Sequence, residues 1–161
     1  MSVTTGIGWD VHRLAAGREL VLGGVRIEHD RGLDGHSDAD VLTHAVIDAL
    51  LGAAGLGDIG EHFPDTDEAF RGADSLALLR DVVGMLSRPP HREVLHVDVS
   101  VLMERPKLAP HKQAIRDALA GALGVAPDRV NVKATTGERL GFVGREEGVA
   151  ALAVATLRAP D

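Results

Sequence analysis

The fold is decided near the end of the chain, by the stretch Gly148-Val149-Ala150-Ala151-Leu152-Ala153-Val154-Ala155-Thr156-Leu157. Side chains of a β-strand alternate between two faces, and here both faces are apolar. Alanines and Val149 lie on one face, opposite Leu152 and Val154 on the other. In a chain of 161 residues, such a strand predicts helices on one face and another subunit on the other.

Shorter patterns predict the rest of the sheet. Residues Val94 to Leu102 alternate strictly, with valines at 97, 99 and 101 on one face, which is typical of a strand. Further strands are expected over Val3–Val11 and Val130–Ala134. Gly23-Gly24 joins two short apolar runs, Glu19–Leu22 and Val25–Glu28, and predicts a tight hairpin.

Three helices are expected between the strands. The first ends near Leu51, and Ser37 followed by Asp40 resembles a capping box at its start. The others are expected over Asp74–Leu86, with Leu76, Leu79, Val83 and Leu86 inward, and from Pro110 to Leu123, with Ile115, Leu119 and Ala122 inward and Gly124 ending it. The glycine-rich residues 52–72 are expected to form a long loop. The predicted fold is α+β, a two-layer sandwich of a mixed sheet with helices on one face, as one domain over residues 1–161.

Composition excludes several classes of function. The absence of cysteine rules out disulfides, a thiol nucleophile and a cysteine zinc site. A net charge of −7 and only four aromatic residues argue against nucleic acid as a partner. No apolar run approaches a membrane span and no targeting segment is visible, so we expect a cytoplasmic protein with no membrane partner.

A metal site is predicted from two segments. Asp10 and His12 lie two apart in a strand and therefore on one face, and His44 lies on a polar stripe of the first helix. One carboxylate and two imidazoles fit a catalytic zinc site, which has three protein ligands and one open position. Asp40 or Asp48, four residues to either side of His44, could orient its ring. The alternative is a surface pair, a packing histidine and solvated helix acids.

Three other segments carry polar groups suited to phosphate. His36 and Ser37 at a helix start fit phosphate binding or a simple N-cap. Thr135, Thr136 and Glu138 follow a strand and fit a phosphate with a hard cation such as Mg²⁺, or a turn without function. Residues 103–110 form either the rim of a ligand pocket or a plain connection.

Taken together, the segments of the chain resemble the 2-C-methyl-D-erythritol 2,4-cyclodiphosphate synthase family. The resemblance rests on six segments in order: Gly8-Trp9-Asp10-Val11-His12, Gly35-His36-Ser37-Asp38-Ala39-Asp40, residues 50–60, Phe63-Pro64-Asp65-Thr66-Asp67, Asn131-Val132-Lys133-Ala134-Thr135-Thr136 and Glu138-Arg139-Leu140-Gly141-Phe142.

The resemblance implies a homotrimer with active sites between subunits and one zinc ion per subunit, bound by Asp10, His12 and His44. It also implies a second cation, Mg²⁺ or Mn²⁺, on Glu138, and catalytic roles for His36 and Thr136. The remaining implied substrate contacts come from these residues: Val11, Ser37, Asp58, Ile59, Gly60, Phe63, Pro64, Asp65, Thr66, Asp67, Met103, Glu104, Arg105, Pro106, Lys107, Leu108, Ala109, Thr135, Gly137, Phe142 and Arg145. Met103 to Ala109 and Thr135 are expected to bind cytidine, and Asp58 to Gly60 the erythritol part.

The implied reaction converts 4-diphosphocytidyl-2-C-methyl-D-erythritol 2-phosphate into the cyclic diphosphate and CMP, in the non-mevalonate route to isoprenoids. It needs no protein nucleophile, only positioning and neutralisation of phosphate charge. Two alternatives remain open from the residues alone. One is a zinc-dependent phosphoesterase, and the other is a non-catalytic trimer that binds isoprenoid diphosphates.

Overall fold

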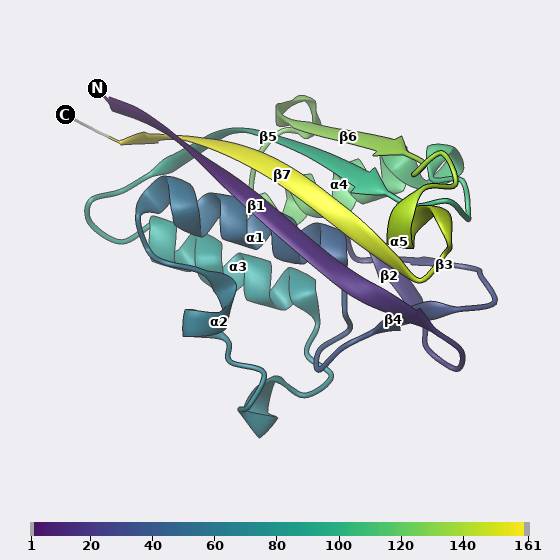
Figure 1. Ribbon diagram of the computed structural model, residues 1–161. Coiled ribbons are helices and arrows are strands. Elements are labelled where there is room, and N and C mark those ends of the chain that lie inside the picture. The colour runs from purple at the N-terminus through teal and green to yellow at the C-terminus, as the bar shows by residue number, and fades with distance from the viewer. Residues whose placement is uncertain (1, 160–161) are drawn as a thin grey trace.

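The computed structural model describes residues 2–159 and contains a five-stranded mixed sheet (Figure 1). The strand order is β4-β1-β7-β5-β6, in which only the pair of β5 and β6 is parallel. A hairpin of two further strands stands beside this sheet. The strands are β1 (Ser2–Ala15), β2 (Leu20–Leu22), β3 (Val25–Ile27), β4 (Gly32–Asp34), β5 (Glu93–Leu102), β6 (Val130–Thr135) and β7 (Gly148–Ala159).

The long helices cover one face of this sheet, which confirms the predicted α+β sandwich (Figure 1). They are α1 (Val41–Ala54), α3 (Ser75–Leu86) and α4 (Lys112–Leu123). Short helical turns are α2 (Ile59–His62), η1 (Glu68–Phe70), η2 (Ala109–His111), η3 (Pro127–Arg129) and α5 (Gly141–Gly144). None of the helices in residues 2–159 has the length and apolar character to cross a bilayer.

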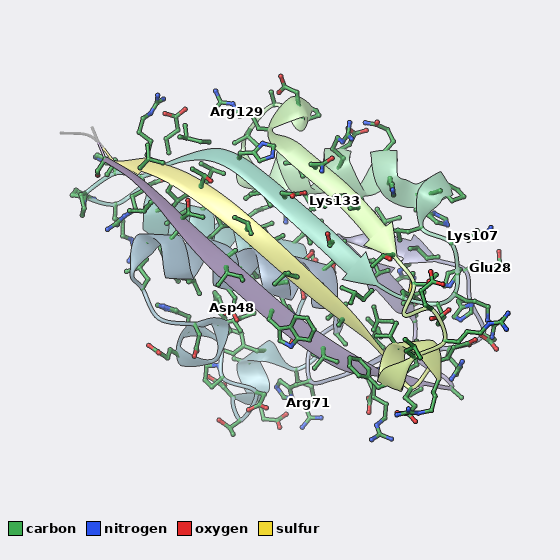
Figure 2. All side chains as sticks on the ribbon, turned by 45° about the horizontal axis from the view of Figure 1, so that its top comes forward. Glu28, Asp48, Arg71, Lys107, Arg129 and Lys133 are labelled. Atoms are coloured by element: carbon green, nitrogen blue, oxygen red, sulfur yellow. The ribbon has the colours of Figure 1, made fainter. Side chains whose placement is uncertain are left out.

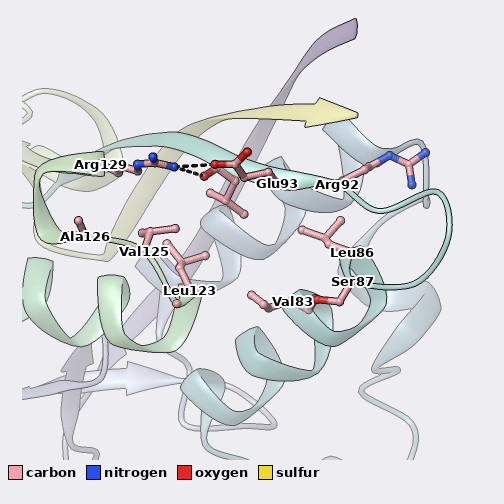
Figure 3. A pocket seen from close by; sticks show the side chains of 11 residues that line it. Val83, Leu86, Ser87, Arg92, Glu93, Leu123, Val125, Ala126 and Arg129 are labelled. Atoms are coloured by element: carbon pink, nitrogen blue, oxygen red, sulfur yellow. Dashed lines mark hydrogen bonds and ion pairs between the residues drawn. The ribbon is translucent and has the colours of Figure 1, made fainter. Parts of the chain in front are cut away.

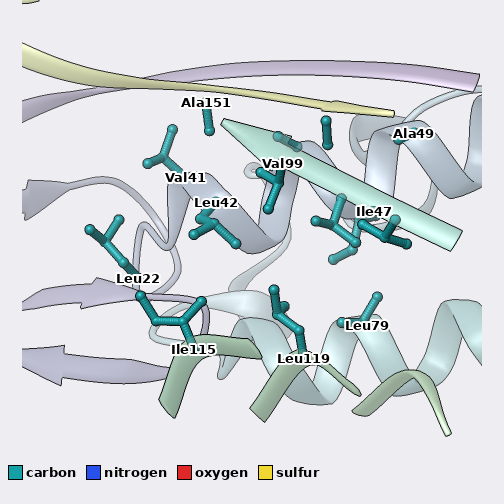
Figure 4. Packing of buried hydrophobic residues seen from close by; sticks show 14 of the residues in the cluster. Leu22, Val41, Leu42, Ile47, Ala49, Leu79, Val99, Ile115, Leu119 and Ala151 are labelled. Atoms are coloured by element: carbon teal, nitrogen blue, oxygen red, sulfur yellow. The ribbon is translucent and has the colours of Figure 1, made fainter. Parts of the chain in front are cut away.

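The hydrophobic core lies between the sheet and these helices (Figure 4). Val99 and Ala151 from the sheet meet Leu42 of α1, and Leu79 and Leu119 close the far side of the core. The predicted inward face of α3 is confirmed in part. Leu79 and Leu86 are buried and Leu76 and Val83 pack against the core partly buried, whereas the buried Leu78 and Val82 were not predicted. The reason is that α3 packs against both α1 and α4, which turns its buried face.

Two glycines of β1 let α1 lie directly on the sheet. A Cβ atom at Gly8 would stand 1.9 Å from the carbonyl oxygen of Ala45, and one at Gly6 would stand 2.1 Å from that of Ala49. Any larger side chain would push the helix away. This close approach brings His44, next to Ala45, toward the residues that follow Gly8 in β1.

The opposite face of β1 carries exposed apolar side chains. Val3, Ile7, Trp9 and Val11 are 57%, 67%, 52% and 44% exposed, and Val154 of β7, which pairs with Ile7, is 38% exposed. We call these five side chains the apolar stripe. Figure 2 looks onto this side of the sheet, where Lys133 on β6 forms an ion pair with Asp98 instead. The prediction of a sheet with two apolar faces is thus confirmed for its β1–β7 centre.

The start of α1 differs from the predicted capping box. Asp40, not Ser37, is the N-cap, and its fully buried carboxylate accepts from the N–H and hydroxyl of Thr43. The same carboxylate accepts from the N–H groups of Gly23 and Gly24 at 2.9 and 2.7 Å. Both glycines have positive φ, so the predicted hairpin turn forms and presents its N–H groups to Asp40. The hairpin therefore helps to fix Asp40, rather than Ser37, as the N-cap.

Candidate active site

Asp10, His12 and His44 converge between β1 and α1, as the sequence predicted. Asp10 Oδ2, His12 Nε2 and His44 Nδ1 lie 3.1 to 3.5 Å from one another. A tetrahedral zinc ion with bonds of about 2.0–2.1 Å holds its ligand atoms about 3.3 Å apart, so the three atoms fit one ion. Among the described residues, this is the one cluster of three or more such side chains with metal-ligand spacing.

The chemistry of the donor set also fits a cation. His12 Nδ1 donates to the backbone carbonyl of Val11 at 2.8 Å, which leaves Nε2 as a lone pair facing the carboxylate of Asp10. Burial lowers the pKa of His12 despite the charge of Asp10, which favours the neutral ring. Burial also opposes the charged form of His44, but the hydrogen bond and charge of Asp10 outweigh it and raise the pKa of His44. A divalent metal is the group that would satisfy all three atoms at once.

The predicted partners of His44 are wrong. Neither Asp40 nor Asp48 contacts its ring. Nε2 of His44 lies 2.8 Å from Ser75 Oγ and 3.2 Å from Ser37 Oγ. Asp48 instead accepts from the backbone N–H of Ile59 at 2.8 Å, and burial raises the pKa of Asp48. Sequence spacing missed Ser75 because it comes from the first turn of α3, which folds back onto α1.

Asp48 thereby ties the predicted erythritol loop to α1. Asp58, whose carboxylate caps Glu61 N–H at 3.0 Å, starts the short helix α2, and Ile59 and Gly60 follow in its first turn. Residues 52–72 were predicted to be a loop, and they contain the end of α1, α2 and η1 instead. Phe63 and Phe70 hold this segment by an edge-to-face contact of 5.4 Å between ring centroids.

His36 reaches the neighbouring predicted loop. Its Nε2 donates to the backbone carbonyl of Asp67 at 3.0 Å, and its own carbonyl accepts from the N–H of Gly72 at 2.8 Å. Asp67 caps η1 through Ala69 N–H. The predicted residues 36–37 and 63–67 thus lie together, on the same side of α1 as the metal cluster.

The predicted cytidine segment lines a separate pocket of about 350 Å³ between η2 and the end of β6. The lining residues are Met103, Glu104, Pro106, Lys107, Leu108, Ala109, Lys112, Ala134, Thr135, Thr136 and Glu138. Arg105 is absent from the lining because its guanidinium pairs with Glu146 at 2.8 Å. Lys112 is a cation that the sequence did not single out.

Thr136 and Glu138 are held together at the mouth of this pocket. The Thr136 hydroxyl donates to Glu138 Oε1 at 3.2 Å and accepts from Glu138 N–H at 3.2 Å. Glu138 and Arg139 both have positive φ, at 51° and 62°, which is costly for residues with side chains. Glu104 supports this turn, because its Oε1 accepts from the N–H groups of Gly137 and Arg139 at 2.8 and 3.1 Å.

Within one chain, the metal cluster and this pocket are well separated. Val11 pairs with Ala150, Ala150 with Leu102, and Leu102 with Thr135. Three strand spacings of about 4.8 Å place the two backbones about 14 Å apart. Phe142 lines a third hollow with Val11 and Glu147, and Arg145 pairs with Glu147 at 2.8 Å.

A further pocket of about 500 Å³ lies at the opposite end of the helices (Figure 3). Val83, Leu86, Leu123 and Val125 form its apolar floor, and the ion pair of Arg129 with Glu93 crosses its rim. It contains none of the predicted site residues.

Comparison with known proteins agrees with this geometry. Residues 3–158 match the YgbB family. A 2-C-methyl-D-erythritol 2,4-cyclodiphosphate synthase of Symbiobacterium thermophilum is 61% identical over 94% of this chain and 96% of its own length. The bifunctional IspDF of Campylobacter jejuni superposes with a TM-score of 0.95 at 46% identity, over 99% of this chain and 43% of that one.

A CDP complex of IspF from Plasmodium falciparum superposes with a TM-score of 0.86 at 27% identity, over 99% of this chain and 98% of that one. The agreement extends over nearly the whole chain in both sequence and fold. This chain therefore belongs to the YgbB family, the family of the 2-C-methyl-D-erythritol 2,4-cyclodiphosphate synthases.

Proposed function

We propose that Asp10, His12 and His44 are the zinc ligands of a cyclodiphosphate synthase. The observation that carries this proposal is the set of three ligand atoms 3.1–3.5 Å apart. The 2-phosphate oxygen of 4-diphosphocytidyl-2-C-methyl-D-erythritol 2-phosphate attacks the β-phosphorus, and CMP leaves. When bound, zinc and a second cation, Mg²⁺ or Mn²⁺, polarise the β-phosphate and neutralise the charge of the diphosphate.

The residues of the chain supply position rather than a nucleophile. Glu138, fixed by Thr136, is proposed as the ligand of the second cation. His36 and Thr136 are proposed to hold the phosphates in line for attack. Support comes from their placement, because each lies beside a group of predicted substrate contacts.

The pocket of residues 103–109 is proposed as the cytidine site. Its size and its apolar lining from Met103 and Leu108 suit a base, and Lys107 and Lys112 supply positive charge for the phosphates. The similar structure from Plasmodium falciparum is a complex with CDP, which supports nucleotide binding in this family. The erythritol part is proposed to contact residues 58–60, with residues 63–67 beside it.

We propose a homotrimer whose active sites lie between subunits. Metal ions that act on one phosphate group stand about 4 Å apart, but the two halves of the site are about 14 Å apart within one chain. This separation supports a site in which the zinc cluster of one subunit meets Glu138 of a neighbouring subunit. The apolar stripe of β1 and β7 supports such an assembly, because an exposed patch of this kind marks a protein interface. One continuous core supports a single domain over residues 1–161.

The test combines a metal analysis with a product assay on the cytidine diphosphate substrate. The expected result is one zinc per chain and release of CMP with the cyclic diphosphate, and loss of both in His44→Ala. A free phosphomonoester as product would favour the phosphoesterase alternative, and binding without CMP release would favour the non-catalytic one. Sedimentation should give about three times 16.9 kDa, and a stable monomer would contradict the trimer.

A further inference from the structure

The hydrogen bonds behind His44 lead to two residues that no predicted role includes, Ser75 and Asp38. Ser75 Oγ lies 2.8 Å from His44 Nε2, on the side of the ring away from the proposed zinc. The same hydroxyl contacts Asp38 Oδ1, and the N–H of Ser75 donates to Asp38 Oδ2 at 2.9 Å. Ser75 is fully buried, one of three buried polar residues that the structure describes.

The hydroxyl hydrogen of Ser75 is donated to Asp38. An ionised carboxylate only accepts, so the contact with Asp38 Oδ1 requires Ser75 to donate its hydroxyl hydrogen there. The Ser75 oxygen is then left as an acceptor toward His44. While no metal is bound, Asp10 Oδ2 is a competing acceptor 3.1 Å from Nδ1; once a cation takes that place, the proton of the His44 ring has its acceptor at Ser75 and lies on Nε2.

We propose that Asp38 and Ser75 are positioning residues that hold the His44 proton on Nε2 and so free Nδ1 for the metal. This inference rests on the proposed zinc site. His12 is fixed in the complementary way by the carbonyl of Val11, which holds its proton on Nδ1 and frees Nε2. Both rings then offer a lone pair to an ion that binds beside Asp10, and neither ring has to turn.

Ser37 is the competing partner of His44, and it is the weaker one. Its oxygen lies 3.2 Å from Nε2 and also accepts from the N–H of Ala39 at 3.2 Å. Among residues 2–159 its hydroxyl has no carboxylate partner, so its proton is not committed. Asp38 is itself anchored, because its N–H donates to the carbonyl of Ala73 at 3.1 Å, two residues before Ser75.

The first experiment measures zinc affinity of the full-length protein by competition with a chelator. Ser75→Ala and Asp38→Asn should each weaken zinc binding by about 10–100-fold, the usual effect of removing an outer hydrogen-bond partner. Ser87→Ala is the matched control, because Ser87 lies at the exposed far end of the same helix and donates only to the Val83 carbonyl. It should bind zinc like the parent.

The second experiment needs no variant to fold. Nitrogen-15 NMR of the zinc-loaded parent should show His44 bound through Nδ1, with a slowly exchanging proton on Nε2. In the Ser75→Ala protein this proton should exchange faster. A parent that binds zinc through Nε2 of His44, or a Ser75→Ala protein that binds zinc as tightly as the parent, overturns this inference alone. A parent that binds no zinc overturns the proposed metal site and this inference with it.

Discussion

Replacing Gly8 by alanine should loosen the metal site through the backbone, without touching any ligand. The new Cβ would stand 1.9 Å from the carbonyl oxygen of Ala45, whereas real Cβ contacts are almost never under 3.0 Å. Strand β1 and helix α1 must therefore separate by about 1 Å, which is the difference between these distances. Asp10 follows Gly8 by two residues and His44 directly precedes Ala45, so their ligand atoms separate with the backbones.

The expected effects follow from this shift. Metal-ligand distances tolerate only about 0.2 Å, so a separation of about 1 Å should weaken zinc binding by at least about tenfold. Overpacking of a close contact should also cost about 1–3 kcal/mol of stability, or roughly 2–12 °C in Tm for a chain of this size.

Chelator competition for zinc and thermal unfolding of the metal-free protein measure the two effects separately. Gly121→Ala is the matched control, because its Cβ would meet nothing within 4 Å in the last turn of α4. It should raise stability by about 0.5–1 kcal/mol and leave zinc binding unchanged. A Gly8→Ala protein with parental Tm and zinc affinity would refute the reasoning, because it would mean that α1 does not rest on Gly8.

Three further predictions concern the rest of the site. Glu138→Gln should lower turnover at limiting Mg²⁺ by at least about tenfold while zinc content stays the same, since an amide is a poor ligand for a hard cation; normal turnover in a Mg²⁺ titration would exclude Glu138 as the ligand. Glu104→Ala leaves two N–H groups of the Glu138 turn unpaired, so it should raise the Mg²⁺ requirement at unchanged zinc content, and an unchanged Mg²⁺ titration would contradict the support seen for that turn. Zinc competes with protons, and the pKa of His44 is raised above the ordinary 6.5 whereas that of His12 is lowered. Zinc affinity should therefore fall about tenfold per pH unit once pH drops below the His44 pKa, and more steeply only when His12 also titrates; a pH-independent affinity down to pH 5 would rule this out.

Much of the fold followed from local pattern. The alternation of Val94–Leu102, the glycine pair of the hairpin and the apolar run of β7 each determine a strand almost alone. The buried face of α3 followed only in part, because Leu78 and Val82 are buried more deeply than Leu76 and Val83 through contacts with two helices that lie elsewhere in the chain. The predicted N-cap of α1 was wrong for a similar reason. The choice between Ser37 and Asp40 depends on a hairpin earlier in the chain.

The candidate site likewise contains residues that local sequence predicts and residues that only the folded structure brings in. The Asp10–His12 pair was predictable because strand geometry puts residues two apart on one face, and the polar stripe of the first helix indicated His44. The resemblance then singled out Glu138 among the open interpretations of its segment. Ser75 was not predictable, because a serine in the first turn of a helix is ordinary until the helix is placed beside His44. Glu104 was assigned to the cytidine segment, and its contact with the Glu138 turn required the pairing of β5 with β6.

Strand β1 has one consequence for how this sequence can change. Its even-numbered residues, Gly6, Gly8, Asp10 and His12, face the helix, and its odd-numbered residues Ile7, Trp9 and Val11 face outward. Suppose one residue were lost between Gly8 and Asp10 while the pairing with β7 was kept. Every earlier side chain of the strand would then move to the opposite face of the sheet. The helix would then meet Ile7 where it needs Gly8. A substitution along this strand can disturb the contact with α1 slightly or strongly, but a change in the length of the strand would disrupt that contact completely.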